Sequence, residues 1–506
     1  MSTGRGDRLF PWAFTLVVLC TLVDRAWLTY TTMGYASDDL VVVWLAAVDY
    51  SHGLFHEPFF YGQDYGVMLE ALIAAPFVRL GFDPITTVAV IFALFTVAPF
   101  LAFAWYYQHR DEWWPALILA AMPVLLPVEH GLQITALNGI ALTAFVPLAW
   151  LVKSTFMRTA LVTMVLSFAV FVNPNAALIA VPIGLYELFQ HRTERNAYLG
   201  VLIGLVPVSL VLGVVRAFFQ AQRAEVVNTI FDWRMHFKPH LILEAFKRLD
   251  SHFAWLSPLS GHAGSIVLIL LIGALVIHVR QRDTRMVWAL VGTLALILLS
   301  FCFAKVHDGY DSIFFPLSRI FLGLPLVLAW ALGSIQVRHR KLEFLTLLVL
   351  ATVLIHTTWR ITTAKEVYTN ALQDQNGLPV RTWSVDGIKG ACERTVELAQ
   401  GTQADHIIII RGNDPITAQF MAYGIPVFHP EAVGTWMADH DRRSFQRYTR
   451  LHEPTGTALI MGGDSTTTTH LASHGLQVSL VDVVEPMALV TNAGSLPISE
   501  MLELVR

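Results

Sequence analysis

Twelve apolar runs, each 14 to 24 residues long, fill most of the first 360 residues of the chain. A helix needs about 20 apolar residues to cross a hydrocarbon core about 30 Å thick, so this repetition constrains the fold more than any other feature. The mean hydropathy of +0.55 agrees with a chain that is solvated by lipid as well as by water. The runs lie near residues 9–31, 66–80, 84–107, 113–128, 134–152, 159–172, 175–190, 196–219, 264–279, 287–304, 315–336 and 343–360.

The fold class that follows is an all-α polytopic membrane protein with about 11 to 12 transmembrane helices over residues 1–360. The run 9–31 is too long for the core of a signal peptide and is expected to remain as the first helix. The run 66–80 is short and carries Glu70 and Arg79, so it is the run expected not to cross.

A second assignment gives the same result for the loops. The runs on either side of Asn173-Pro174-Asn175 can be joined into one crossing, and the positions of the first loop and the tail stay the same. Basic clusters prefer cytoplasmic loops, and three of them fall in alternating loops, at His191–Arg195, Arg280–Arg285 and Arg338–Lys341. The outer side is then left with the loops 32–65, 220–262 and 305–314 and with everything after residue 360.

After residue 360 the apolar runs shrink to the length of strands. The segment Ile416–Tyr423 has the pattern of an amphipathic helix. Residues 361–506 are therefore expected to form a soluble α/β domain outside the membrane. Its strands are predicted at His406–Ile410, Pro426–Phe428, Ala458–Met461 and Gln477–Val481.

Charge and cysteine content exclude several classes of protein. The net charge of -4 argues against a nucleic-acid partner, which a strongly basic face would bind. The cysteines are too few and too scattered for a disulfide framework or a metal site. They are Cys20, Cys302 and Cys392.

Two adjacent carboxylates, Asp38 and Asp39, begin the first outer loop. A carboxylate at the membrane surface can accept a proton from a nucleophilic hydroxyl, or hold a divalent cation such as Mg²⁺ or Mn²⁺ through its oxygens. The structural alternative is that one of them is the N-cap of a helix that starts at Leu40, since Asp is a favoured cap. An amphipathic stretch follows, over residues 41–50.

These features together resemble a known superfamily. A first helix, a carboxylate pair, a juxtamembrane amphipathic helix and the stretch from Tyr61 to Glu70 look like the C-type (GT-C) membrane glycosyltransferases. That superfamily includes the dolichyl-phosphate-mannose protein mannosyltransferases and the bacterial aminoarabinose transferases. The resemblance implies an inverting transfer, with or without a metal, of a sugar from a polyprenyl-phosphate lipid at the outer face of a bacterial inner or plasma membrane.

The resemblance also implies roles for individual residues. Asp38 is favoured as the base and Asp39 as its partner, although the family more often has one Asp and one Glu, which leaves the choice open. Arg319 follows a polar outer loop and is expected to meet the donor phosphate, as its planar fork allows. Lys305 is a second phosphate candidate. The structural alternative for Arg319 is a salt bridge with Asp311.

Further polar residues of the outer loops are candidates for substrate binding, because donors and acceptors suit a polyol. Those of the later loop are also compatible with a plain solvated loop. The candidates are His56, Tyr61, Gln63, Asp64, Glu70, His307 and Asp308. The histidines and acids of the first loop lack the spacing of a zinc site.

Two charged residues lie within the first apolar run. Asp24 and Arg25 lie near the outer end of the first helix and are expected to snorkel toward water.

The acceptor is a glycan, a lipid or a protein, and no residue chooses among them. The rival function is a transporter or flippase of a lipid-linked substrate, in which broken helices and charges near the midplane are usual.

Overall fold

The computed structural model describes most of the 506 residues. The described ranges are 6–55, 57–61, 65–132, 137–222, 236–257, 262–309, 316–337, 339–373, 382–410, 415–432, 434–438, 456–462, 465–482, 487–491 and 496–505. The chain divides into two compact units. Unit 1 comprises Met1–Thr32, Ala89–Gly213 and Asp232–Asp374, and unit 2 comprises Met33–Val88, Val214–Phe231 and Gln375–Arg506.

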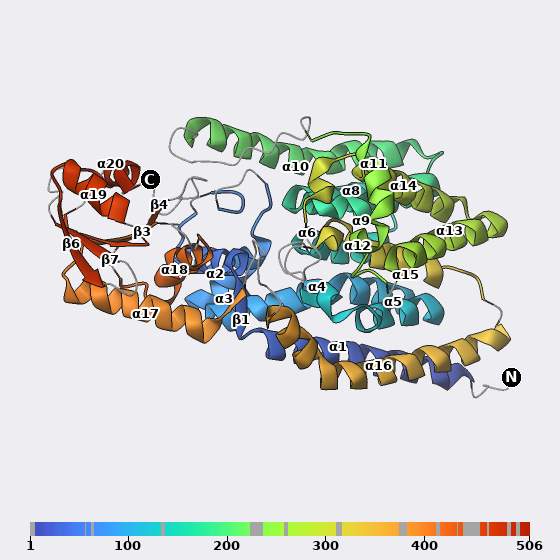
Figure 1. Ribbon diagram of the computed structural model, residues 1–506. Helices are drawn as coiled ribbons and strands as arrows, with labels where there is room; N and C mark the ends of the chain where they lie inside the picture. The colour runs from blue at the N-terminus through green and yellow to red at the C-terminus, as the bar shows by residue number, and fades with distance from the viewer. Residues whose placement is uncertain are drawn as a thin grey trace. The chain divides into compact units, whose positions relative to one another are not determined.

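Unit 1 is built from helices, and every apolar run predicted within it contains helix (Figure 1). The first residues of α4 and the last of α10 belong to unit 2. The helices are α1 (Gly6–Thr32), α4 (Pro84–His109), α5 (Trp113–Leu125), α6 (Asn138–Leu142), α7 (Val146–Trp150), α8 (Thr155–Val172), α9 (Ala177–Gln190), α10 (Arg195–Gln222), α11 (Leu241–Lys247), α12 (Leu249–His252), α13 (Ala263–Gln281), α14 (Thr284–Ser300), α15 (Leu324–Gly333) and α16 (His339–Gln373).

Among the described residues, six helices are long and apolar enough to cross a membrane, which confirms a mostly helical membrane protein. They are Leu9–Thr32, Pro84–His109, Thr155–Val172, Arg195–Phe218, Ala263–Gln281 and Lys341–Thr363. Four more apolar segments are shorter: Trp113–Leu125, Asn138–Trp150, Thr284–Ser300 and Leu324–Gly333. Eleven or twelve crossings therefore stay a prediction.

Short breaks separate several of the helices. Asn173 ends α8 and is the N-cap of the 3₁₀ turn η3 (Pro174–Ala176), because its side chain accepts a hydrogen bond from the amide of Asn175. Its amide group also donates to Oδ1 of Asn138 at 3.1 Å. The apolar runs on either side of this segment are therefore two helices and not one continuous helix.

Close packing through glycine joins α10 to α8. Ideal Cβ atoms at Gly200 and Gly204 would collide with the backbone of Phe156 and Ala160. Residues four apart on a helix lie on the same face, so the two glycines form one contact stripe. This is the small-residue packing that lets membrane helices approach each other.

Unit 2 contains α2 (Asp38–Ser51), α3 (Leu69–Arg79) and all seven of the described strands. Strand β1 (Tyr35–Ser37) pairs antiparallel with β2 (Thr382–Ser384), so the first predicted loop and the tail belong to one compact unit that is discontinuous in sequence. Helix α3 has 11 residues and is about 16 Å long, too short to span the bilayer. Helix α16 continues to Gln373, past the predicted boundary at 360.

The tail contributes a five-stranded sheet with the strand order β4-β3-β5-β7-β6. Strand β3 runs parallel to β4 and β5, whereas β7 is antiparallel to both of its neighbours. The predicted strand at Pro426–Phe428 is wrong, since these residues end helix α18, which packs on α2 and α17. The remaining elements are β3 (His406–Ile410), β4 (Gly434–Ala438), β5 (Ala458–Met461), β6 (Gln477–Asp482), β7 (Met487–Thr491), α17 (Val385–Gly401), α18 (Pro415–Phe428), α19 (Ser465–Ser473) and α20 (Ile498–Val505).

Candidate functional site

The carboxylate pair of unit 2 lies in the first turn of α2. The helix begins at Asp38 and not at Leu40, and its N-cap is Ser37, whose hydroxyl accepts a hydrogen bond from the amide of Leu40 at 3.3 Å. The structural alternative, in which Asp38 or Asp39 is the N-cap, is therefore wrong. Both carboxylates are half-buried and sit where the helix dipole favours negative charge.

The sequence predicted an amphipathic stretch over residues 41–50, but helix α2 is not amphipathic. Eight consecutive residues, Leu40–Ala47, are buried, because α3 and α18 pack around the helix. The ring of Trp44 meets that of Phe428 edge to face at 6.4 Å. The carboxylate pair thus begins a helix that is held inside unit 2.

The same unit gathers acidic residues around two tyrosines. The hydroxyl of Tyr61 donates to Oδ2 of Asp49 at 2.9 Å. Burial, followed by the charge of Asp49, raises the pKa of Tyr61 well above its usual value. Glu57 and Glu70 are buried as well, and burial together with the acids raises the pKa of Tyr50. The phenols therefore stay protonated, and that of Tyr61 acts as a hydrogen-bond donor.

Three predicted site residues of the first loop, His56, Gln63 and Asp64, lie outside the described residues. Across the part of the chain that the structure does describe, no group of three or more His, Cys, Asp or Glu side chains is placed to hold a metal ion. Tyr61 and Glu70 are both almost fully buried. They can therefore act on a ligand only from inside the folded unit.

Unit 1 holds the other predicted cluster, in the 3₁₀ turns η4 (Ala304–His307) and η5 (Leu317–Phe321). The guanidinium of Arg319 is half-buried and donates to two backbone carbonyls, those of Asp308 and of Pro316. The backbone carbonyl of Arg319 accepts a hydrogen bond from the side-chain amide of Asn175 at 3.4 Å. Arg319 thus ties together the two ends of the segment 308–316, and the alternative partner, Asp311, lies outside the described residues.

The η4 turn brings together Lys305, His307 and Asp308. Lys305 and Asp308 form an ion pair at 3.1 Å. Nε2 of His307 lies 3.0 Å from the carbonyl oxygen of Phe301. These contacts stabilise the turn.

A histidine that sequence reasoning missed lies against this turn. The rings of His252 and His307 meet edge to face with their centroids 5.1 Å apart. His252 is fully buried, and burial, with smaller contributions from His307 and Arg248, lowers its pKa to about 3. It is therefore a neutral imidazole next to one of the predicted site residues.

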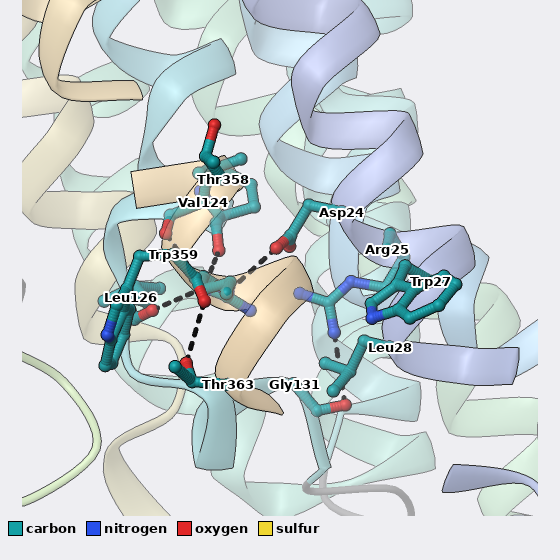
Figure 2. Close-up of polar contacts among 12 residues, drawn as sticks. Asp24, Arg25, Trp27, Leu28, Val124, Leu126, Gly131, Thr358, Trp359 and Thr363 are labelled. Carbon is teal, nitrogen blue, oxygen red and sulfur yellow. Dashed lines mark hydrogen bonds and ion pairs between the residues drawn. The ribbon is translucent and has the colours of Figure 1, made fainter. Parts of the chain in front are cut away.

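Unit 1 also contains a buried ion pair that the sequence analysis did not predict. Nε of Arg360 on α16 lies 2.8 Å from Oδ1 of Asp24 on α1. The expectation that Asp24 and Arg25 snorkel to water is wrong, since they are only 3% and 4% exposed. Figure 2 labels Asp24 together with Val124 and Leu126, whose carbonyl oxygens accept hydrogen bonds from Nη1 of Arg360.

Arginine 25 has a separate partner. Its guanidinium donates to the carbonyl oxygen of Gly131 at 3.3 Å, the contact drawn at the lower right of Figure 2. A signal for the charge cluster was present in the sequence, because opposite charges stood inside two apolar runs. Such charges are costly in a membrane helix unless they pair.

Comparison of the chain with models of protein families, with curated proteins and with solved structures finds no match.

Proposed function

We propose that the protein is a glycosyltransferase that moves a sugar from a polyprenyl-phosphate carrier to an acceptor at the outer face of the membrane. The observation that carries the proposal is the position of Asp38 and Asp39 in the first turn of α2, directly after the N-cap Ser37. Because Ser37 makes the capping bond, capping does not account for two adjacent carboxylates at this point.

In the proposed reaction the acceptor hydroxyl attacks the anomeric carbon as the bond to the phosphate oxygen breaks. Asp38 accepts the hydroxyl proton, and Asp39 is its partner. Polyprenyl phosphate leaves with the electron pair of the broken bond. The guanidinium of Arg319 supplies positive charge for the departing phosphate, with Lys305 as a second cation.

The chain offers only some of the ligands that a divalent cation at this site would need. If Mg²⁺ or Mn²⁺ takes part, Asp38 and Asp39 offer the oxygen ligands that these ions prefer, and the substrate and water would have to complete the shell. The cation would then polarise the phosphate. The proton transfer assigned to Asp38 is the part that the chain itself provides.

The sheet and helices that follow β2 are assigned to a soluble α/β domain on the outer side, within reach of an acceptor in water. Buried phenols and carboxylates such as Tyr61 and Glu70 suit hydrogen bonding to sugar hydroxyls or the support of residues that bind them. The acceptor is a glycan, a lipid or a protein.

The test uses the purified protein in liposomes with radiolabelled polyprenyl-phosphate sugars and a native membrane extract as the source of acceptor. We expect release of polyprenyl phosphate from one donor, and a loss of about 100-fold or more in Asp38→Asn or Asp39→Asn. Arg319→Ala is expected to raise the KM for the polyprenyl-phosphate donor.

Two variants are matched controls. Asp83→Asn changes an exposed carboxylate that accepts a hydrogen bond from the amide of Thr86. Arg110→Ala changes an exposed cation paired with Glu112. Both should keep wild-type release. Release that persists in both Asp variants would refute the assigned base, and movement of intact lipid across the bilayer without release would favour the transporter.

A further inference from the structure

Helix α5 ends within the helical unit. Its 13 residues span about 20 Å, less than the roughly 30 Å of a hydrocarbon core. The last carbonyl groups of a helix have no partner in a following turn, and a membrane interior has no water to supply one. The residue after the helix, Leu126, is already extended. The end of α5 therefore needs donors from elsewhere in the fold.

Arg360 supplies those donors from α16. Its Nη1 atom lies 3.3, 2.8 and 2.6 Å from the carbonyl oxygens of Pro123, Val124 and Leu126. Broken membrane helices often hold a bound cation with such carbonyl groups. Here the cation is a side chain, and Asp24 is its counter-charge. Helices α1 and α16 lie side by side and run in the same direction (Figure 1).

The turn that follows, η1 (Val128–Leu132), is held at its other end by Arg25. The guanidinium of Arg25 lies so close to Gly131 that an added Cβ atom would be 2.8 Å from its Cζ. A side chain at position 131 would therefore displace the guanidinium of Arg25 from this contact. Two arginines from two helices thus fix both sides of one short segment.

His130 connects this segment to the turn that carries Arg319. The imidazole is buried, and its Nε2 atom lies 3.4 Å from the carbonyl oxygen of Leu322. Leu322 is the C-cap residue of η5, the turn that contains Arg319. A continuous set of contacts therefore runs from the Asp24–Arg360 pair to the Arg319 turn.

We infer that Arg360 is a positioning residue, which fixes the end of α5 and the turn η1 and, through His130, the η5 turn that carries Arg319. The importance of this turn for the donor phosphate rests on the proposed function. The mechanical coupling of Arg360 to η5 does not. The two claims can therefore fail separately.

Hydrogen exchange on the full-length protein in nanodiscs tests the coupling. Arg360→Lys keeps the charge and removes the planar fork, and His130→Phe keeps a ring and removes the contact with Leu322. Each is expected to speed exchange of the amides of residues 317–322 about tenfold. Arg158→Lys is the matched control, since Arg158 pairs with Glu187 at 2.8 Å elsewhere in unit 1. Unchanged exchange in either test variant would overturn the inference.

Donor affinity tests the functional consequence. In wild type, Arg360→Lys should raise the donor KM and change kcat little, whereas in the Arg319→Ala background it should add no further loss. Additive losses would limit Arg360 to a role in stability and overturn its positioning role. If Arg319→Ala leaves the donor KM unchanged while the exchange coupling is seen, the role of Arg319 at the donor phosphate fails and the coupling stands.

Discussion

The carboxylate of Asp24 and the guanidinium of Arg360 meet at 2.8 Å with both side chains at most 3% exposed. They come from the first and the last long apolar helices of the chain, 336 positions apart in sequence (360 minus 24). Desolvating two charges is costly, and the cost is offset only while both partners are present and hydrogen-bonded. The pair therefore makes the packing of α1 on α16 depend on one specific register.

Breaking this pair from one side should be harmful. We expect Asp24→Asn to lower the free energy of unfolding by about 3 to 5 kcal/mol, because Arg360 then keeps a buried charge without its partner. Arg360→Met should cost more, since the carbonyl groups at the end of α5 also lose their donor. The double variant should recover part of the loss of Arg360→Met.

The measurement is thermal unfolding of the purified protein in detergent. Arg110→Met, which breaks the exposed pair with Glu112, is the control and should change the free energy of unfolding by less than about 1 kcal/mol. Asp24→Asn and the control behaving alike would mean that the buried pair is not stabilising.

Two glycines of α10 should respond to the same substitution with opposite signs. An added Cβ at Gly204 would lie 2.8 Å from Cβ of Thr163, so Gly204→Ala should push α10 from α8 and lower the free energy of unfolding by about 1 to 3 kcal/mol. An added Cβ at Gly213 meets nothing within 4 Å. Gly213→Ala should therefore stabilise the helix by up to about 1 kcal/mol. Thermal unfolding decides the signs, and equal signs would contradict this packing.

Substitutions in the first turn of α2 should show how much the cap and the carboxylate each contribute to stability. Ser37→Ala is expected to lower the free energy of unfolding by about 1 kcal/mol through loss of the cap, and Ser37→Asp should keep it. Asp38→Asn should cost less, about 0.3 to 1 kcal/mol, because the interaction with the helix dipole weakens. Thermal unfolding of the three variants gives the order. A larger loss in Asp38→Asn than in Ser37→Ala would mean that the carboxylate is the main stabilising group.

Acid should weaken the start of α14 through Asp283. This carboxylate accepts a hydrogen bond from the amide of Met286, and its pKa is lowered, mainly by His278, whose Nδ1 atom lies 3.6 Å from Oδ2 of Asp283. A folded-state pKa below the usual 3.8 means that the stabilisation is complete above about pH 4 and is lost as the pH falls through the folded-state value. Unfolding temperatures between pH 6 and pH 3 should fall more steeply for wild type than for Asp283→Asn. Identical slopes would contradict this contribution.

Much of the helical unit followed from the apolar runs. A run of this length has few other ways to satisfy its backbone in lipid, so each predicted run contains a helix. Lengths were less certain, since α5 stops at Leu125 where a longer run had been predicted. The donor to its last carbonyl groups, Arg360, is 235 positions away (360 minus 125) and cannot be seen in a local pattern.

For the candidate sites, too, the sequence indicated which residues to consider, and only the structure showed their contacts. The sequence showed that Asp38 and Asp39 stand together after the first helix, and that Arg319 follows a polar loop. Helix capping by Ser37 and the tie from Arg319 to the carbonyl groups of Asp308 and Pro316 appear only in the folded chain.

The sequence by itself determined that the chain is a mostly helical membrane protein, because hydrophobic length and backbone hydrogen bonding are local properties. Only the tertiary structure decided which charges are buried and with which partners. Asp24 and Arg25 have the pattern of snorkelling residues when α1 is considered alone, and they become buried once α16 brings Arg360 and η1 brings Gly131. Burial and pairing depend on neighbours that are distant in sequence, and a local pattern does not contain them.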